Sequence, residues 1–138
     1  MNSGRLDFSR THIGVIAACA ASAGAHAALV PRHLDHEPRL GAAFIAATAL
    51  LVAVAAGLIY RPTDPWVGDA ATLTLMALIG AYAVSVTSGL PWLADGAESL
   101  DVVGLATKAV EALGVVFAIR LNTTMGGRGP LPHKEARP

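Results

Sequence analysis

The sequence predicts an all-α integral membrane protein, a four-helix up-down-up-down bundle with both termini cytoplasmic. Three observations lead to this prediction: four long apolar stretches, prolines between them, and an uneven distribution of basic residues. A helix of ~20 residues that rises ~1.5 Å per residue spans a hydrocarbon core of roughly 30 Å. The composition agrees, because 54% of the residues are hydrophobic and only 14% are charged, which is too little polar surface for a small soluble globule.

The four helices are expected at about residues 11–30, 41–60, 69–90 and 101–121. The prolines that fall between these ranges are Pro31, Pro38, Pro62, Pro65 and Pro91. Proline interrupts a helix because it lacks the backbone N–H and its ring clashes with the preceding turn. These residues therefore mark the expected connections.

The bundle is expected to occupy residues 1–121, and residues 122–138 to form a flexible, basic cytoplasmic tail rich in Gly and Pro. The first apolar stretch follows Arg5 and Arg10 and ends in small residues, which is also typical of a signal peptide. We expect a retained helix, with a cleaved signal peptide as the alternative.

The orientation follows from the basic residues. Short connections make neighbouring helices antiparallel, so both termini lie on one side. The Lys and Arg residues on that side are Arg5, Arg10, Arg61, Arg120, Arg128, Lys134 and Arg137, and those on the other side are Arg32 and Arg39. Because basic residues accumulate on the cytoplasmic side, the sequence predicts a multi-pass plasma-membrane protein whose first and third loops lie outside the cell.

Two ionisable residues, Lys108 and Glu111, interrupt the fourth apolar stretch and share a helical face. Counted from the outer ends of the helices, Lys108 lies roughly 10 Å deep, at the level of Tyr82 and Ser22. His26 and Ser85 lie about one turn further out. The sequence therefore predicts a polar intramembrane seam, which is interpreted as an internal ion pair, a proton or cation site, or a contact with another subunit.

The first outer loop contains a second candidate site. Its members are His26, His33, His36 and Glu37. Imidazole and carboxylate groups suit Zn²⁺ or Cu²⁺, and these side chains would converge if the chain turned back at Pro31. Asp95, Glu98 or Asp101 would then supply a further ligand. The alternative is a solvated loop at the level of the lipid headgroups.

The sequence contains no motif for nucleic-acid binding, nucleotide binding or nucleophilic catalysis. The formal net charge is zero, which argues against a nucleic-acid partner. No glycine loop of the nucleotide-binding type and no Ser with a plausible His and acid partner is present, so the chain is not expected to be an enzyme. Cys19 is the single cysteine and excludes an intrachain disulfide. The candidate cofactor is Cu or Zn, and the sequence leaves open whether a lipid or pigment is bound.

One series of residues runs through the apolar stretches: His26, Pro31, His33, His36-Glu37-Pro38, Gly41, Phe44, Gly89-Leu90-Pro91, Asp101, Gly104 and Glu111. In this series the chain resembles small four-helix integral membrane proteins of high-GC Gram-positive, actinobacterial-type bacteria. The resemblance implies a shared architecture with a cluster of His and Glu on the outer face. It implies no activity.

Small residues dominate the first two apolar stretches. In lipid, helices associate by close approach through small side chains. We therefore expect a non-catalytic accessory or assembly subunit of a larger membrane complex, whose partners are other membrane subunits, a second copy of the chain and the lipid bilayer. Two alternatives stay open: extracytoplasmic binding of a divalent metal by the outer loop, and a proton or cation pathway at Glu111.

Overall fold

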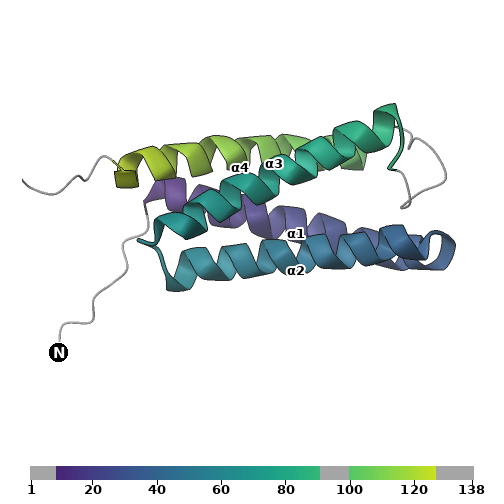
Figure 1. Cartoon of the computed structure of the whole chain (residues 1–138), viewed down its shortest axis with the longest axis horizontal. Coiled ribbons are helices and arrows are strands. Elements are labelled where there is room, and N and C mark those ends of the chain that lie inside the picture. The colour runs from purple at the N-terminus through teal and green to yellow at the C-terminus, as the bar shows by residue number, and fades with distance from the viewer. Residues whose placement is uncertain (1–8, 91–99, 127–138) are drawn as a thin grey trace, which may run out of the picture.

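The computed structural model describes residues 9–90 and 100–126. These residues form four helices in the order α1 (Arg10–His36), α2 (Pro38–Tyr60), α3 (Pro65–Thr87) and α4 (Val102–Gly126) (Figure 1). All four are long and apolar enough to cross a membrane. For the described part of the chain this confirms the predicted all-α class with four helices long and apolar enough to span a membrane.

Each of the first three helices begins at a capping side chain or at a proline in its first turn. The Ser9 hydroxyl accepts a hydrogen bond from the His12 N–H at 3.2 Å, which satisfies a free donor in the first turn of α1. Pro38 and Pro65 occupy first-turn positions, where proline has no hydrogen bond to lose. Asp64 caps α3 by accepting from the Trp66 N–H at 3.1 Å.

The predicted end of the first helix is wrong. α1 continues through Pro31 to His36, so only Glu37 separates it from α2. Proline fixes φ near −65°, which is compatible with a helix, and inside one it removes a single hydrogen bond. The expected loop from Pro31 to Glu37 is therefore mostly helix.

Smaller corrections apply to α3 and α4. α3 starts four residues before the predicted boundary and ends at Thr87, shortly before Gly89 adopts a left-handed φ of 74°. α4 extends to Gly126, so the start of the predicted tail is helical. The rest of that tail, with Arg128, Lys134 and Arg137, lies outside the described residues, as do Asp95 and Glu98.

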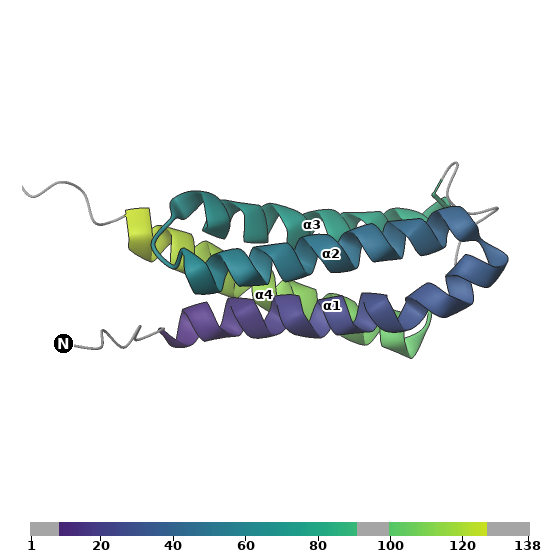
Figure 2. The same cartoon turned by 90° about the horizontal axis from the view of Figure 1, so that it is seen from below.

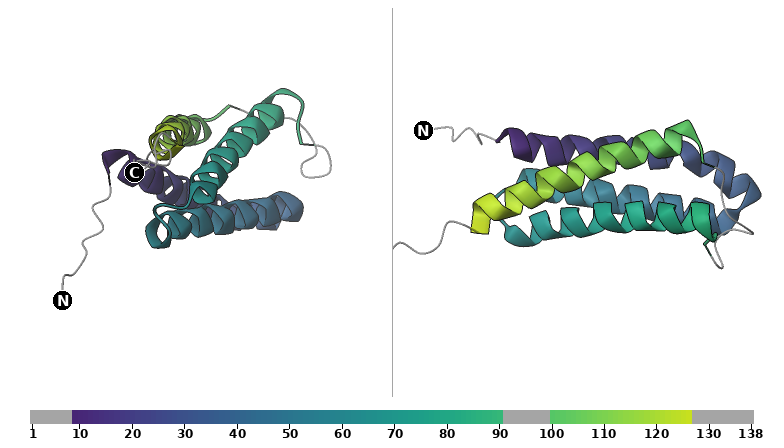
Figure 3. Two further views of the ribbon diagram at one scale, coloured as in Figure 1. Left: turned by 60° about the vertical axis from the view of Figure 1, so that its left-hand side comes forward. Right: turned by 90° about the horizontal axis from the view of Figure 1, so that it is seen from above.

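The two ends of the bundle differ. We call the end where α1 begins and α4 finishes the closed end, and the end where α1 meets α2 the open end (Figures 1 and 2). An apolar core cluster contributed by all four helices contains Val15, Cys19, Ala23, Leu51, Val54, Leu58, Ala71, Leu75, Ala118 and Leu121. α2 and α3 contact each other less extensively than α1 and α2 do, and the helices diverge toward the open end (Figure 3).

Polar contacts and a close helix approach reinforce the closed half. His12 Nε2 lies 2.9 Å from the Leu58 carbonyl oxygen near the C-terminus of α2, and Asn122 donates to Asp69 at 2.8 Å. Gly114 lets α4 approach α1 and α3, because a Cβ built there would meet Ala18 at 2.7 Å. Small residues thus provide the close packing that lipid-immersed helices require.

Candidate functional site

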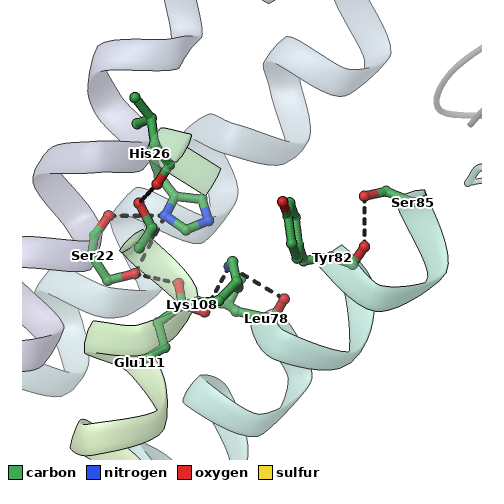
Figure 4. A network of polar contacts seen from close by, with 9 residues as sticks. Ser22, His26, Leu78, Tyr82, Ser85, Lys108 and Glu111 are labelled. Carbon is green, nitrogen blue, oxygen red and sulfur yellow. Dashed lines mark hydrogen bonds and ion pairs between the residues drawn. The ribbon is translucent and has the colours of Figure 1, made fainter. Parts of the chain in front are cut away.

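A chain of polar contacts links α1 and α4 in the middle of the bundle (Figure 4). The Ser22 hydroxyl donates to Glu111 Oε1 at 2.6 Å, and Lys108 Nζ donates to Glu111 Oε2 at 2.6 Å. Lys108 also lies 3.4 Å from the carbonyl oxygen of Leu78 in α3. Both carboxylate oxygens of Glu111 are therefore occupied within the chain.

Burial makes this pairing necessary. Glu111 is fully buried, whereas 13% of the Lys108 side chain is exposed. A carboxylate away from water is tolerated when an opposite charge and hydrogen bonds compensate for the lost solvation. The spacing of three residues along α4 places both groups on one face. This geometry agrees with the internal ion pair among the three interpretations of the seam.

His26 extends the network along α1. Its Nδ1 lies 2.9 Å from the Ser22 carbonyl oxygen and 3.4 Å from the Ser22 hydroxyl. Because a carbonyl oxygen only accepts hydrogen bonds, Nδ1 carries a proton, and in the neutral imidazole Nε2 is then the acceptor. In Figure 4 the second ring nitrogen points toward the side on which Tyr82 lies.

Tyr82 lies beside the ion pair without bonding to it. Lys108 Nζ is 5.5 Å from the centre of the Tyr82 ring, within the range of a cation–π contact. The Tyr82 hydroxyl is buried and has no hydrogen-bond partner among the described residues. Gly104 makes room for it, since a Cβ there would lie 2.9 Å from the hydroxyl oxygen. Ser85 donates only to the Tyr82 carbonyl oxygen and does not join the network.

The network borders a cleft of about 770 Å³ at the open end of the bundle. His26, Tyr82 and Lys108 line it, together with apolar side chains from all four helices. Arg32, His33, His36, Glu37 and Asp101 also belong to its lining. Residues of the predicted polar seam and of the predicted outer His/Glu cluster therefore line the same cleft.

The residues proposed as metal ligands do not converge on one point, and each makes its own hydrogen bond to the backbone of α1. His33 Nδ1 is 2.9 Å from the Leu29 carbonyl oxygen, and His36 Nδ1 is 3.0 Å from that of Arg32, as expected of side chains along a continuous helix. Glu37 terminates α1 through its backbone N–H, which donates to the His33 carbonyl at 2.7 Å. Among the described residues no group of three His, Cys, Asp or Glu side chains is arranged to hold a metal ion.

The sequence does not predict the contacts of two further residues at the site, Phe44 and Gly104. The Phe44 ring packs between the two histidines, 5.6 Å from His26 and 4.7 Å from His33 between ring centres. Because Gly104 has no side chain, the Tyr82 ring can lie against α4 at this position. Both belonged to the series that carries the family resemblance, but their contacts depend on how α2 and α4 are rotated, which one sequence does not specify.

Four helices of this length and hydropathy define the class of the chain, that of a multi-pass membrane protein. Comparison with known proteins adds nothing more particular, because no family model, no curated protein and no solved structure matches the chain. The resemblance to small actinobacterial-type membrane proteins stays a prediction.

Proposed function

We propose that this chain is a non-catalytic subunit of a larger assembly in the plasma membrane. Its four helices cross the bilayer alternately up and down, and both termini lie in the cytoplasm. The observation that supports this proposal is the exposed face of α1. Between Ile13 and Pro31, both of which are exposed, every other exposed position is Ala or Gly. These positions are Ala17, Ala20, Ala21, Gly24, Ala27 and Ala28. Their spacing of three or four residues places them along one stripe of the helix.

The other helices present a different surface. Their exposed faces mix Ala with large apolar side chains, namely Leu50, Val52 and Ile59 on α2, Leu73, Met76 and Val84 on α3, and Leu105, Leu113, Val116 and Ile119 on α4. Large apolar side chains are compatible with lipid chains, whereas Ala and Gly allow another helix to approach closely. This contrast favours α1 as the contact with a second membrane helix.

The alternative of a proton or cation pathway has less support. Ser22, His26 and Lys108 connect Glu111 to the open cleft, but the core cluster between Glu111 and the closed end is apolar. A path across the whole membrane would need polar groups or water on both sides of Glu111. The geometry thus favours assembly over conduction by a single chain.

Two glycines provide a matched test of the assembly proposal. A Cβ built at Gly24 on α1 or at Gly80 on α3 meets nothing within 4 Å, so both sites accept a side chain within the isolated bundle. Gly80 lies in line with Met76 and Val84, on a face with large exposed side chains. Gly24→Leu should disrupt a helix contact at α1, and Gly80→Leu should not.

The measurement is the mass of the complex extracted from the native membrane in a mild detergent, by native electrophoresis and light scattering. Wild type and Gly80→Leu are expected to migrate with a partner or as an oligomer, and Gly24→Leu to lose roughly tenfold in complex, the effect of overpacking a close contact. Mass spectrometry then distinguishes a second copy from another subunit. A wild-type chain at the mass of one 14.1 kDa protomer overturns the proposal, and so does an equal yield of complex from both variants.

A further inference from the structure

The cleft at the open end has the construction of a small-molecule site. Its volume of about 770 Å³ lies within the range of roughly 300–1,000 Å³ that is usual for ligand pockets. Its apolar lining includes Leu29, Leu40, Phe44, Ala47, Leu78 and Val103. Such sites combine an apolar wall with a few converging polar groups that orient the ligand.

The polar groups that reach this cleft differ in what they offer. Lys108 is a donor whose side chain is 13% exposed, and the buried Tyr82 hydroxyl has no partner among the described residues. A buried hydroxyl without a hydrogen bond destabilises a protein, so a native structure normally supplies a partner from water or a ligand. The unpaired Tyr82 hydroxyl therefore points to an oxygen-bearing occupant.

His26 supplies the complementary group. Its Nδ1 proton is directed to the Ser22 carbonyl at 2.9 Å, which leaves Nε2 as an acceptor in a residue that lines the cleft. The described cleft thus presents two donors and one acceptor around the same space. A head group that both accepts and donates hydrogen bonds matches this set.

The charges around the cleft argue for an uncharged head. Glu111 neutralises Lys108 at 2.6 Å, so an anionic ligand would compete with a carboxylate that is already in place. Asp101 and Glu37 also line the cleft, and Arg32 is the other cation there among the described residues. The described lining thus carries no excess of positive charge to offset the desolvation of an anion, and Lys108 repels a cation near its ammonium group.

We propose that this cleft binds an uncharged amphiphile whose head carries both a hydroxyl and a carbonyl oxygen. Lys108 and Tyr82 donate to oxygens of the head, and His26 Nε2 accepts from its hydroxyl. The hydrocarbon tail lies along the apolar wall that includes Phe44 and Leu78. Binding requires no covalent step and no change in the Lys108–Glu111 ion pair.

The test uses the full chain in liposomes and probes that share a ten-carbon chain, each carrying the same photoreactive group. The probes are monodecanoylglycerol, which is uncharged and has hydroxyl and carbonyl oxygens, decyl phosphate and decyltrimethylammonium. After illumination, mass spectrometry locates the labelled peptides. Monodecanoylglycerol is expected to label the segments around Phe44 and Tyr82 several-fold more than either charged probe does. Stronger labelling by a charged probe, or equal labelling by all three, overturns the proposal.

The two tyrosines of the chain provide a matched pair of variants. Tyr82→Phe removes only the unpaired hydroxyl and should reduce labelling by monodecanoylglycerol about fivefold, the effect of one hydrogen bond. Tyr60→Phe changes a residue that is 83% exposed at the closed end and should leave labelling unchanged. If both variants are labelled like wild type, water satisfies Tyr82 and the proposal is wrong.

A second variant keeps the test decisive if Tyr82→Phe does not fold. Ala47→Leu adds volume to the wall of the cleft and should abolish labelling at that site, with Ala49→Leu on an exposed face of the same helix as its control. Unchanged labelling in Ala47→Leu contradicts binding in the cleft. These experiments use the chain alone, so their outcome is separate from that of the assembly test on α1.

Discussion

Glu111 holds Lys108 inside the bundle through an unequal pair. Lys108 Nζ lies 2.6 Å from Glu111 Oε2, yet the carboxylate is fully buried while 13% of the lysine side chain is exposed. Glu111 is enclosed by Ser22 and Lys108 and has no oxygen free for a ligand. Lys108 instead borders the cleft. Glu111 is therefore the structural member of the pair, and Lys108 is the member that a ligand in the cleft can reach.

The first prediction concerns the free energy of unfolding of variants in this pair. Lys108→Met leaves the fully buried Glu111 carboxylate unpaired and should destabilise the bundle by about 3 kcal/mol, whereas Glu111→Leu leaves the partly exposed Lys108 unpaired and should cost somewhat less. The double variant should be destabilised by much less than the sum, since it leaves neither charge. Reversible unfolding in bicelles by titration with a denaturing detergent measures all three values.

The contrary result for this pair is simple additivity. If the double variant is destabilised by the sum of the single effects, the two charges do not compensate each other in the bilayer. Arg120→Met, at an exposed position toward the other end of α4, provides a similar loss of a basic group away from the pair.

A second prediction compares two buried serines. Ser22→Ala removes the donor to Glu111 and should cost about 2 kcal/mol, because a charged group loses a hydrogen bond. Ser85→Ala removes a bond from a hydroxyl to a helical carbonyl oxygen, which already serves the helix, and should cost less than about 1 kcal/mol. The same unfolding titration distinguishes them. Equal losses would show that the Ser22 contact contributes no more than a local backbone bond.

Much of the fold could be predicted because it depends on local sequence. The length of each apolar run predicts a helix long enough to span a membrane, and Pro38 and Pro65 mark first turns that have no hydrogen bond to lose. The predicted helix end at Pro31 is wrong because proline restricts but does not forbid a helix, and this sequence does not distinguish an interior proline from a terminal one. The extension of α1 then carries His33 and His36 along a helix, where they bond to its carbonyls.

The site was partly predictable for a similar reason. Spacing placed Lys108 and Glu111 on one face, and depth counted along the helices brought Ser22 to their level, where it contacts Glu111. The Ser85 hydroxyl has the right depth but bonds to its own helix. Depth is given by the rise per residue, whereas the direction of a side chain depends on helix rotation, which packing between helices determines.

A third prediction concerns the place where Tyr82 meets α4. A Cβ at Gly104 would lie 2.9 Å from both the hydroxyl oxygen and a ring carbon of Tyr82, so Gly104→Ala should displace the ring and cost about 1–3 kcal/mol. Adding Tyr82→Leu removes the obstructing ring and should recover part of the loss. Unfolding titrations of the single and double variants measure both effects. An unchanged Gly104→Ala variant would mean that the ring moves aside freely.

The last prediction concerns the close approach of α4 to its neighbours at Gly114. A Cβ there would lie 2.7 Å from Ala18 Cβ and 2.8 Å from a methyl group of Leu75, and Ala18 is held on the α1 backbone with no torsion that could move its Cβ away. Gly114→Ala should therefore separate α1 and α4 and cost about 2 kcal/mol. Gly80→Ala is the matched control, because its new Cβ meets nothing within 4 Å and alanine favours a helix over glycine by roughly 0.5–1 kcal/mol. The two substitutions should thus change the free energy of unfolding in opposite directions, and a stabilised Gly114→Ala variant would contradict the helix packing described here.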